Sequence, residues 1–254
     1  MILRLAISLL AVIMSSPFSP PSAVLDGDLL QEVNRLRLVV PIVSNVAHDI
    51  NNALQVVNGS GELLALKTSI GPNEQRRIQS ITTQTGRIAA MLDRLVSFTR
   101  TDTIDARAAV DLAELAETAV SLRAFTLGRA RISTRVERGA APHVASVIRR
   151  SILQLLLNVL MNAEEALKGR SDGTIVIAVS RRNADCLVSI ADNGPGIAAD
   201  ARARALATTP PRVQADLSGI GLWVSRRIAT QHGGDLDVVA ASGTTVTLTL
   251  PALD

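Results

Sequence analysis

The sequence predicts an α+β protein with two domains: an N-terminal helical hairpin, and an α/β sandwich in which helices cover one face of a mixed sheet. In the first part of the chain, apolar residues recur in alternating steps of three and four, the spacing of helices that pack along one seam. In the second part, segments with helical spacing alternate with segments in which apolar and polar residues take turns, as in strands. We therefore expect the hairpin over residues 25–102, a linker over 103–111 and the sandwich over 112–254.

Composition supports a buried core and excludes one class of partner. The chain of 254 residues is 47% hydrophobic but only 2% aromatic and has no tyrosine, so its core must be aliphatic. The net charge of +3 is small and no basic run is interleaved with aromatic residues, which argues against nucleic acid as a partner. The single cysteine, Cys186, allows no internal disulfide and suits a reducing compartment.

Residues 1–24 have the shape of a secretory signal. Arg4 precedes an apolar run from Leu5 to Met14, and a segment rich in proline and serine follows. The run is too short to span a bilayer. Three interpretations stay open: a weak membrane anchor, an inert tail, or a coding start at Met14. We expect a cytoplasmic protein, with the inner face of the membrane as the place of an anchored form.

The first helix is expected from about Asp26 to Leu66, and the second from Pro72 to about Phe98. The apolar seam of the first helix is formed by Leu36, Val40, Val43, Ala47, Ile50, Leu54 and Val57. A hairpin buries only one side of each helix, so pairing of two copies into a four-helix bundle would close the core. We therefore expect a homodimer. The alternative is a hairpin that lies on its own second domain.

His48 lies in the first predicted helix, next to polar residues that could support chemistry at its imidazole. Asp49 is its neighbour, and Asn52 follows one turn later on the same side of the helix. A carboxylate can hold an imidazole in one tautomer and take its proton when a ring nitrogen attacks a phosphoryl group. The Asn52 amide could orient a water or a phosphate beside the ring. The plain alternative is a histidine on the flank of a packed helix.

Beyond the expected linker, helices and strands follow in mixed order. Helices are predicted at 112–127, 148–167 and 219–231. Strands are predicted at 131–137, 174–179, 186–191, 236–240 and 244–250. This order predicts one mixed sheet with helices on one face.

Asn158 and Asn162 lie one turn apart inside an apolar helical run, so they share a helix face. A buried amide without a partner costs about 1–3 kcal/mol, so both should face a polar site. An amide oxygen is a hard ligand that suits Mg²⁺. The alternative is a pair of amides that cap a helix or join two helices.

Two glycine-containing segments lie further along the chain. Asp192 stands at a strand end, and Gly194 and Gly196 after it permit close approach of a flat ring to the backbone. The Asp192 carboxylate can accept a hydrogen bond from an exocyclic amine. Gly219 and Gly221 open a helix, where backbone N–H groups can bind phosphate. Each segment alone is weak evidence, because an Asp-Asn-Gly-Pro-Gly sequence is also an ordinary turn.

Together these segments resemble two known signatures. The stretch around His48 resembles the phospho-acceptor box of sensor histidine kinases whose box reads His-Asp-x-Asn-Asn. The three later segments, by their order and spacing, resemble the N, G1 and G2 boxes of the Bergerat ATP-binding fold, which histidine kinases share with gyrase-type ATPases. The resemblance covers about residues 39–250.

The resemblance implies a role for each of these residues. It implies that His48 is phosphorylated, that Asp49 is the general base and that Asn52 aids dephosphorylation of the partner. In the ATP-binding domain, the implied roles are phosphate contact for Asn158, Mg²⁺ binding for Asn162, adenine recognition for Asp192, and shaping of the pocket for Gly194, Gly196, Gly219 and Gly221. Residues 198–218 would form the lid over the nucleotide.

The sequence departs from the family at several positions. Ala53 stands where a proline commonly follows the phospho-acceptor box, and Leu217 stands at the first glycine of the usual G2 pattern. The lid lacks its usual phenylalanine-rich part and the lysine after its threonines. Asn158 occupies the position of the glutamate that serves as the base in hydrolytic members, which favours an imidazole nucleophile over water.

The leading hypothesis is a sensorless histidine kinase of a two-component system. It would autophosphorylate on His48 with ATP and Mg²⁺ and pass the phosphoryl group to an aspartate in the receiver domain of a separate response regulator. A separate sensor protein would supply the input. The alternative is a dimeric histidine phosphotransfer or scaffold protein with a degenerate ATP-binding domain. A gyrase-like ATPase is disfavoured by Asn158 and by the helical hairpin.

Overall fold

The computed structural model describes residues 26–65, 71–99, 106–140, 142–210 and 220–253. Within these ranges, the side chains at 40, 41, 44–49, 51, 65, 87 and 89–99 are not described. The chain divides into two compact units, one formed by residues 1–38 and 105–254 and the other by residues 39–104. The signal-like residues 1–24 lie outside the described part. No described helix is both long and apolar enough to cross a membrane.

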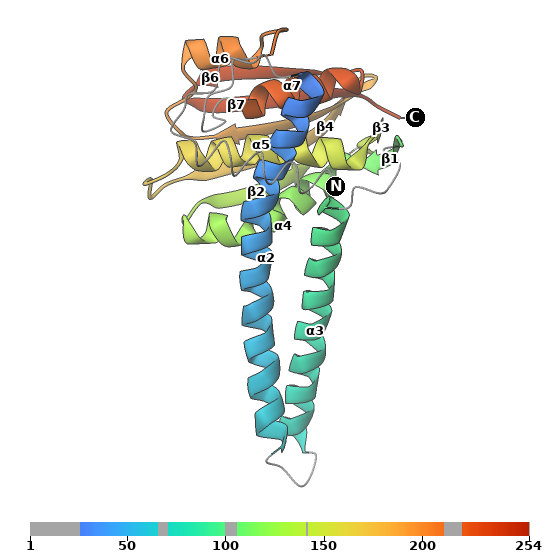
Figure 1. Cartoon of the computed structure of the whole chain (residues 1–254), viewed down its shortest axis with the longest axis vertical. Coiled ribbons are helices and arrows are strands. Elements are labelled where there is room, and N and C mark those ends of the chain that lie inside the picture. Colours follow the sequence, from blue (N-terminus) through green and yellow to red (C-terminus); the bar gives the residue numbers. More distant parts are fainter. Residues whose placement is uncertain (1–25, 66–70, 100–105, 141, 211–219, 254) are drawn as a thin grey trace. The chain divides into compact units, whose positions relative to one another are not determined.

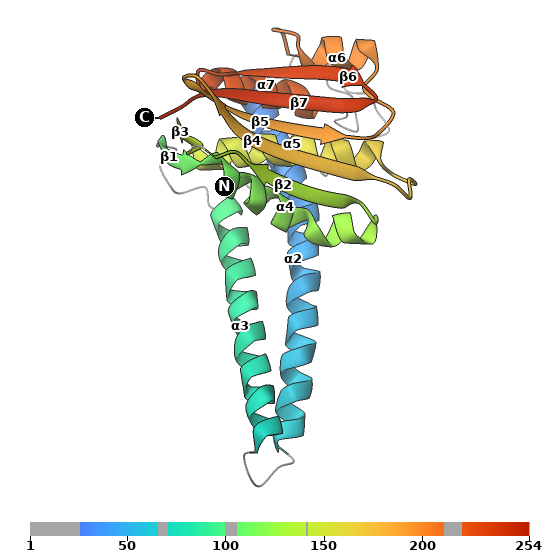
Figure 2. The ribbon, with the colours of Figure 1, turned by 180° about the vertical axis from the view of Figure 1, so that it is seen from behind.

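The smaller unit consists of two antiparallel helices, the greater part of α2 and the whole of α3 (Figures 1 and 2). α2 (Gly27–Ala65) and α3 (Pro72–Thr99) begin and end within one residue of the limits that the apolar seams predict. A proline can open α3 because the first N–H groups of a helix have no helical partner. The Glu74 carboxylate accepts a hydrogen bond from the Gly71 N–H at 2.9 Å and so satisfies a free donor at this end.

The apolar seam of these helices is partly open in the single chain. Val43 and Leu54 of α2 are 39% and 41% exposed, and Ile78 of α3 is 44% exposed. Ile42 and Ala53, each one position before an exposed seam residue, are buried instead. Large apolar side chains exposed along a helix pair form a surface that can pack against another one.

The larger unit is built on a five-stranded mixed sheet with the strand order β2-β4-β5-β7-β6. The strands are β2 (Ser133–Arg138), β4 (Thr174–Arg182), β5 (Asp185–Asp192), β6 (Asp235–Ala241) and β7 (Gly243–Pro251). β2 and β4 are parallel, whereas the other neighbouring strands are antiparallel. Alternate apolar side chains are buried: Ile175, Ile177, Val179, Val188, Ile190, Val246, Leu248 and Leu250. The mixed sheet and its helices confirm the α+β class.

Helices cover one face of this sheet, as the opposite views of Figures 1 and 2 show. α5 (Arg149–Ala166) packs against both α4 (Leu112–Arg129) and α7 (Ile220–Gln231). Every residue of α5 from Ser151 to Leu160 is buried. This explains the long apolar run in its sequence, since a helix covered on several sides has no polar face.

Three short elements differ from the sequence-based expectation. β1 (Ala108–Asp111) pairs antiparallel with β3 (Val144–Val147), so the second half of the expected linker is a strand. α6 (Ala199–Ala205) lies within the expected lid. Elements of four to seven residues are too short to show a clear periodicity, which is why the sequence did not reveal them.

The first turns of α2 also differ from the expectation, because residues 26–38 belong to the larger unit. Leu30 and Leu38 are buried there. Asp28 forms an ion pair with Arg227 of α7, and Asn34 forms hydrogen bonds with α5. The helical seam could not show this, because these partners lie in the second half of the chain.

Candidate functional site

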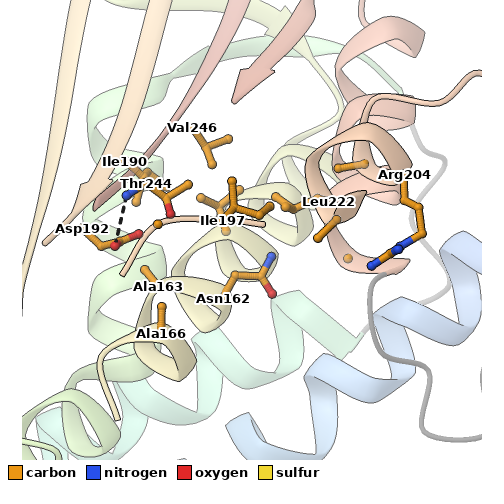
Figure 3. A pocket seen from close by; sticks show the side chains of 15 residues that line it. Asn162, Ala163, Ala166, Ile190, Asp192, Ile197, Arg204, Leu222, Thr244 and Val246 are labelled. Carbon is orange, nitrogen blue, oxygen red and sulfur yellow. Dashed lines mark hydrogen bonds between the residues drawn. The ribbon is translucent and has the colours of Figure 1, made fainter. Parts of the chain in front are cut away.

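A cavity of about 240 Å³ opens among α5, α6, α7 and the adjoining ends of β5 and β7 (Figure 3). Its walls are mainly aliphatic and include Val159, Ile190, Ile197, Leu222 and Val246. Within the described part of the chain, the charged side chains of the lining are Asp192 and Arg204. An apolar cavity with a few well-placed polar groups is typical of a small-molecule site.

Asp192, the last residue of β5, is held in place by backbone donors. Its Oδ1 atom accepts hydrogen bonds from the N–H groups of Gly194 at 2.8 Å and Thr244 at 3.3 Å. Its other oxygen accepts no hydrogen bond from any residue that the structure describes. A fixed carboxylate with one free oxygen can accept a hydrogen bond from an amine of a ligand.

Glycines bring the backbone close to this carboxylate. A Cβ atom at Gly194 would lie 2.8 Å from Asp192 Oδ1 and 3.3 Å from the Ala166 Cβ. Gly243, which opens β7, has φ 147°, and a Cβ there would lie 1.9 Å from the Asp192 carbonyl oxygen. Gly196, with φ 84°, lines the cavity. Gly243 requires glycine because a Cβ atom there would overlap the Asp192 backbone, and Gly196 favours glycine because of its positive φ. A side chain at Gly194 would push the Asp192 carboxylate away.

Asn162 lies on the last turns of α5, and its side chain is exposed and lines the cavity. Figure 3 shows its amide between Asp192 at one end of the cavity and Arg204 at the other. The amide forms no hydrogen bond with any residue in the described part of the chain. Its oxygen is therefore free to bind a ligand or a hard cation such as Mg²⁺.

Asn158 is placed differently from the sequence-based expectation. It is 3% exposed and does not line the cavity. Its Nδ2 donates to Asn34 Oδ1 at 2.8 Å and its Oδ1 accepts from Asn34 Nδ2 at 3.0 Å, while Ser225 Oγ lies 3.4 Å from Nδ2. Gln154 also donates to Asn34 Oδ1, at 2.9 Å. In this arrangement the Asn158 amide is bonded to Asn34 of α2, the kind of contact that the interhelix alternative describes. A role in phosphate contact stays a prediction.

The other predicted residues fall partly outside the described structure. Gly221 lines the cavity on the first turn of α7, but Gly219 and Leu217 are not among the described residues. His48 and Asp49 lie within α2, in the unit of residues 39–104, and their side chains are not described. Asn52 on the same helix has an exposed side chain.

Two polar residues of the cavity were missed by sequence reasoning. Thr244 pairs directly with Asp192 in the β5–β7 ladder and contributes to the lining. The sequence predicted a strand at 244–250 but not its pairing with the Asp192 strand, so no signal pointed to Thr244. Arg204 comes from α6, a helix that the sequence did not predict, so no signal pointed to it.

Comparison with known proteins defines the class of this domain. Residues 148–254 match the family described as "Histidine kinase-, DNA gyrase B-, and HSP90-like ATPase". This match contains α5, the Asp192 loop and α7, and it confirms the predicted resemblance of the three later segments to this ATP-binding fold. All residues that line the cavity lie within the part of the chain that matches this family.

The chain as a whole is homologous to sensor histidine kinases. It is 30% identical over 226 residues to the C4-dicarboxylate transport sensor protein DctB of Rhizobium meliloti (strain 1021), covering 88% of this chain and 36% of that protein. It is 29% identical over 227 residues to the sensor histidine kinase ZraS of Escherichia coli (strain K12), covering 88% of this chain and 48% of that protein. The chain thus spans less than half the length of these two relatives.

Solved structures share the fold. The catalytic domain of the histidine kinase ThkA superposes with a TM-score of 0.51 at 22% identity, over 57% of this chain and 95% of that one. ThkA in complex with the response regulator protein TrrA gives a TM-score of 0.50 at 20% identity, over 86% of this chain and 63% of that one.

Proposed function

We propose that the protein is an ATP-dependent histidine kinase that phosphorylates His48 and passes the phosphoryl group to an aspartate of a separate response regulator. The observation that carries the proposal is the cavity in which Asp192 is fixed at one end and the Asn162 amide is open. Homology to sensor histidine kinases supports it.

The cavity suits an adenine nucleotide in its chemistry. Aliphatic side chains such as Ile190, Ile197 and Val246 offer apolar surface to a flat base. The free oxygen of Asp192 can accept a hydrogen bond from the exocyclic amine of adenine, and this contact would distinguish adenine from a base that lacks the amine. The backbone at Gly196 allows the base to lie close to the chain.

Asn162 is the residue that would hold Mg²⁺. No three His, Cys, Asp or Glu side chains cluster as metal ligands in the part of the chain that the structure describes. A Mg²⁺ ion is commonly bound by one or two protein oxygens together with the phosphates of its nucleotide. When bound, it would neutralise the charge of the phosphates during transfer.

The phosphoryl transfer step would take place on His48. A ring nitrogen of His48 forms the new nitrogen–phosphorus bond as the bond between the γ-phosphorus and the bridging oxygen breaks, and ADP leaves with that electron pair. Asp49 takes the proton that the ring loses. An aspartate of the response regulator then attacks the phosphorus and releases the imidazole.

A homodimer is part of the proposal. Val43, Leu54 and Ile78 are exposed on the helices of the smaller unit, and two copies could cover them in a four-helix bundle. The response regulator is proposed by analogy with ThkA, which was solved with such a partner.

A second candidate is histidine phosphotransfer without ATP turnover. One observation favours it: the amide of Asn158 is bonded to Asn34 instead of being open to the cavity. In that case His48 would accept its phosphoryl group from a phosphorylated receiver domain.

Incubation of the full chain with γ-labelled ATP and Mg²⁺ tests the proposal. The expected product carries an acid-labile, base-stable label, as a phosphohistidine does. His48→Ala should abolish the label and leave ATP affinity nearly unchanged, because the acceptor and the cavity belong to different units. Asp192→Ala should weaken ATP binding, and the amount of label should fall with it, because a charge-assisted hydrogen bond is lost.

Label that persists on His48→Ala would contradict the assignment of the acceptor. Absence of ATP binding, together with transfer to His48 from a phosphorylated receiver domain, would favour the second candidate.

A further inference from the structure

Among the described residues that line the cavity, Arg204 is the only one with a cationic side chain. It belongs to α6, whose residues Ala201, Arg204 and Ala205 all contribute to the lining. Residues spaced by three and four share one face of a helix, so this face of α6 is turned toward the cavity. Arg202 lies off that face, is exposed, and is not part of the lining.

Three of the polar side chains that line the cavity follow one another in a definite order. In Figure 3, Asp192 lies at one end, the Asn162 amide in the middle and Arg204 at the other end. A ligand whose base contacts Asp192 and whose bound metal contacts Asn162 would extend its phosphates toward Arg204. A guanidinium can bind two oxygens of one phosphate at once, which gives strong and directional recognition.

Arg204 is held by a single ion pair in the described structure. Its Nη1 atom lies 2.6 Å from Asp200 Oδ2, one helical turn earlier. The side chains of Arg204 and Asp200 are 56% and 69% exposed, and an exposed pair of this kind contributes little to stability. Its clearest effect is local: the hydrogen bond from Arg204 lowers the pKa of Asp200. A phosphate could therefore replace the carboxylate without much loss.

We propose that Arg204 is a specificity-determining residue that binds the terminal phosphates of the nucleotide and exchanges Asp200 for them. The inference rests on the proposed nucleotide site. Asp200 then acts as a competitor, which keeps the guanidinium near the cavity before the nucleotide arrives.

Calorimetry with ATP, ADP and adenosine tests this assignment, with Arg202→Gln as the matched control on the same helix. Arg204→Gln should weaken ATP about tenfold or more, the scale expected for a lost charge-assisted hydrogen bond. It should leave adenosine within about twofold, since adenosine has no phosphate. Arg202→Gln should change neither ligand beyond about twofold, because an exposed charge away from the site is screened. Asp200→Asn should tighten ATP by removing the competing carboxylate.

Several outcomes would overturn the assignment. Equal losses of ATP affinity in Arg204→Gln and Arg202→Gln would show a general charge effect. Equal losses for ATP and adenosine in Arg204→Gln would show a structural role. A further outcome is that the unmodified protein binds both ligands and Arg204→Gln binds ATP and adenosine with the same affinities as the unmodified protein. In that case the inference about Arg204 is wrong and the proposed nucleotide site is supported. If the unmodified protein binds neither ligand, both fail.

Discussion

Asn158 and Asn162 are the same residue type, one turn apart on α5, yet their surroundings differ completely. Asn158 is 3% exposed and shares two hydrogen bonds with Asn34, whereas Asn162 is exposed and lines the cavity. A spacing of four places both on one side of the helix. The surroundings of each amide depend on what lies against that part of α5. α2 packs over Asn158, whereas the cavity lies beside Asn162.

The difference has a physical cause in the cost of buried amides. Asn158 has almost no access to water, so an unmade hydrogen bond there would cost about 1–3 kcal/mol. Asn34, Gln154 and Asn158 satisfy one another, and Ser225 adds a weaker contact. Asn162 faces open space, so water or a ligand can satisfy it. One asparagine therefore holds structure together, and the other is available for binding.

The largest expected difference between the two asparagines is in the loss of nucleotide affinity when each is replaced by alanine. Asn162→Ala should weaken Mg²⁺-ATP about tenfold or more, since contacts to charged groups contribute about 1.5–3 kcal/mol, and should nearly remove the Mg²⁺ dependence of binding. Asn158→Ala should change the affinity for Mg²⁺-ATP by less than about threefold, which corresponds to no more than one weak hydrogen bond. Calorimetry with and without Mg²⁺ measures both. A larger loss in Asn158→Ala would mean that its amide turns toward the phosphates when nucleotide binds.

For the free energy of unfolding we expect the opposite order, with the larger loss at Asn158. Asn158→Leu should lower the free energy of unfolding by about 1–3 kcal/mol, because the amide of Asn34 loses its main partner. Asn162→Leu should change it by less than about 0.5 kcal/mol, as expected for an exposed site. Urea unfolding followed by the fluorescence of Trp223, the only tryptophan and 4% exposed, reports on the larger unit.

A double variant sharpens the stability test. Asn34→Leu combined with Asn158→Leu should cost less than the sum of the two single changes, because no unpaired amide then remains between these positions. Strictly additive costs would show that the two amides are not coupled, and the explanation of the Asn158 environment would be wrong.

The smallest expected effect is a change in the pH dependence of stability, and it concerns His232. This residue forms a hydrogen bond at the start of α5. His232 Nε2 accepts a hydrogen bond from the Ile148 N–H at 3.1 Å, and its Nδ1 lies 2.7 Å from the Ile228 carbonyl oxygen. Burial lowers the pKa of His232 below its usual value, and the charge of Arg107 adds to the effect. A proton on Nε2 would also remove the acceptor for Ile148.

The direction of the pH dependence follows from this lowered pKa. The unfolded chain takes up a proton as pH falls through about 6.5, whereas the folded His232 does so only at lower pH. The stability that His232 contributes is complete above about pH 6.5 and is lost as pH falls from there toward the folded pKa. His232→Gln, which cannot be protonated, should flatten the change in urea midpoint between about pH 7.5 and about pH 5.5. An unchanged slope would show that other groups cause it.

Periodicity was enough to predict most of the fold. The limits of α2 and α3 and the central strands followed from seams and alternation, because burial on one face leaves that trace in the sequence. β1, β3 and α6 are too short to leave it. The docking of residues 26–38 on the larger unit could not be foreseen either, because it depends on pairs such as Asn34 and Asn158, which are 124 positions apart.

The candidate site was predictable where its residues are local in sequence. Asp192, Gly194 and Gly196 form one loop, and their mutual contacts follow from a strand end and a turn. Thr244 and Arg204 reach the cavity only through the register of β7 and the placement of α6, and a single sequence does not encode these visibly. The roles of His48, Asp49 and Gly219 stay predictions.

Gly243 has a consequence for how this site can change over generations. Its missing side chain lets the start of β7 meet the Asp192 backbone directly, so the carboxylate is positioned by main chain and not by the aliphatic wall. Exchanges in the wall, such as Val246→Ile, would reshape the cavity while Asp192 keeps its place. An evolving lineage could in this way alter its preferred ligand by gradual steps. Any replacement at position 243 would instead move the Asp192 carboxylate and remove its contact with the ligand.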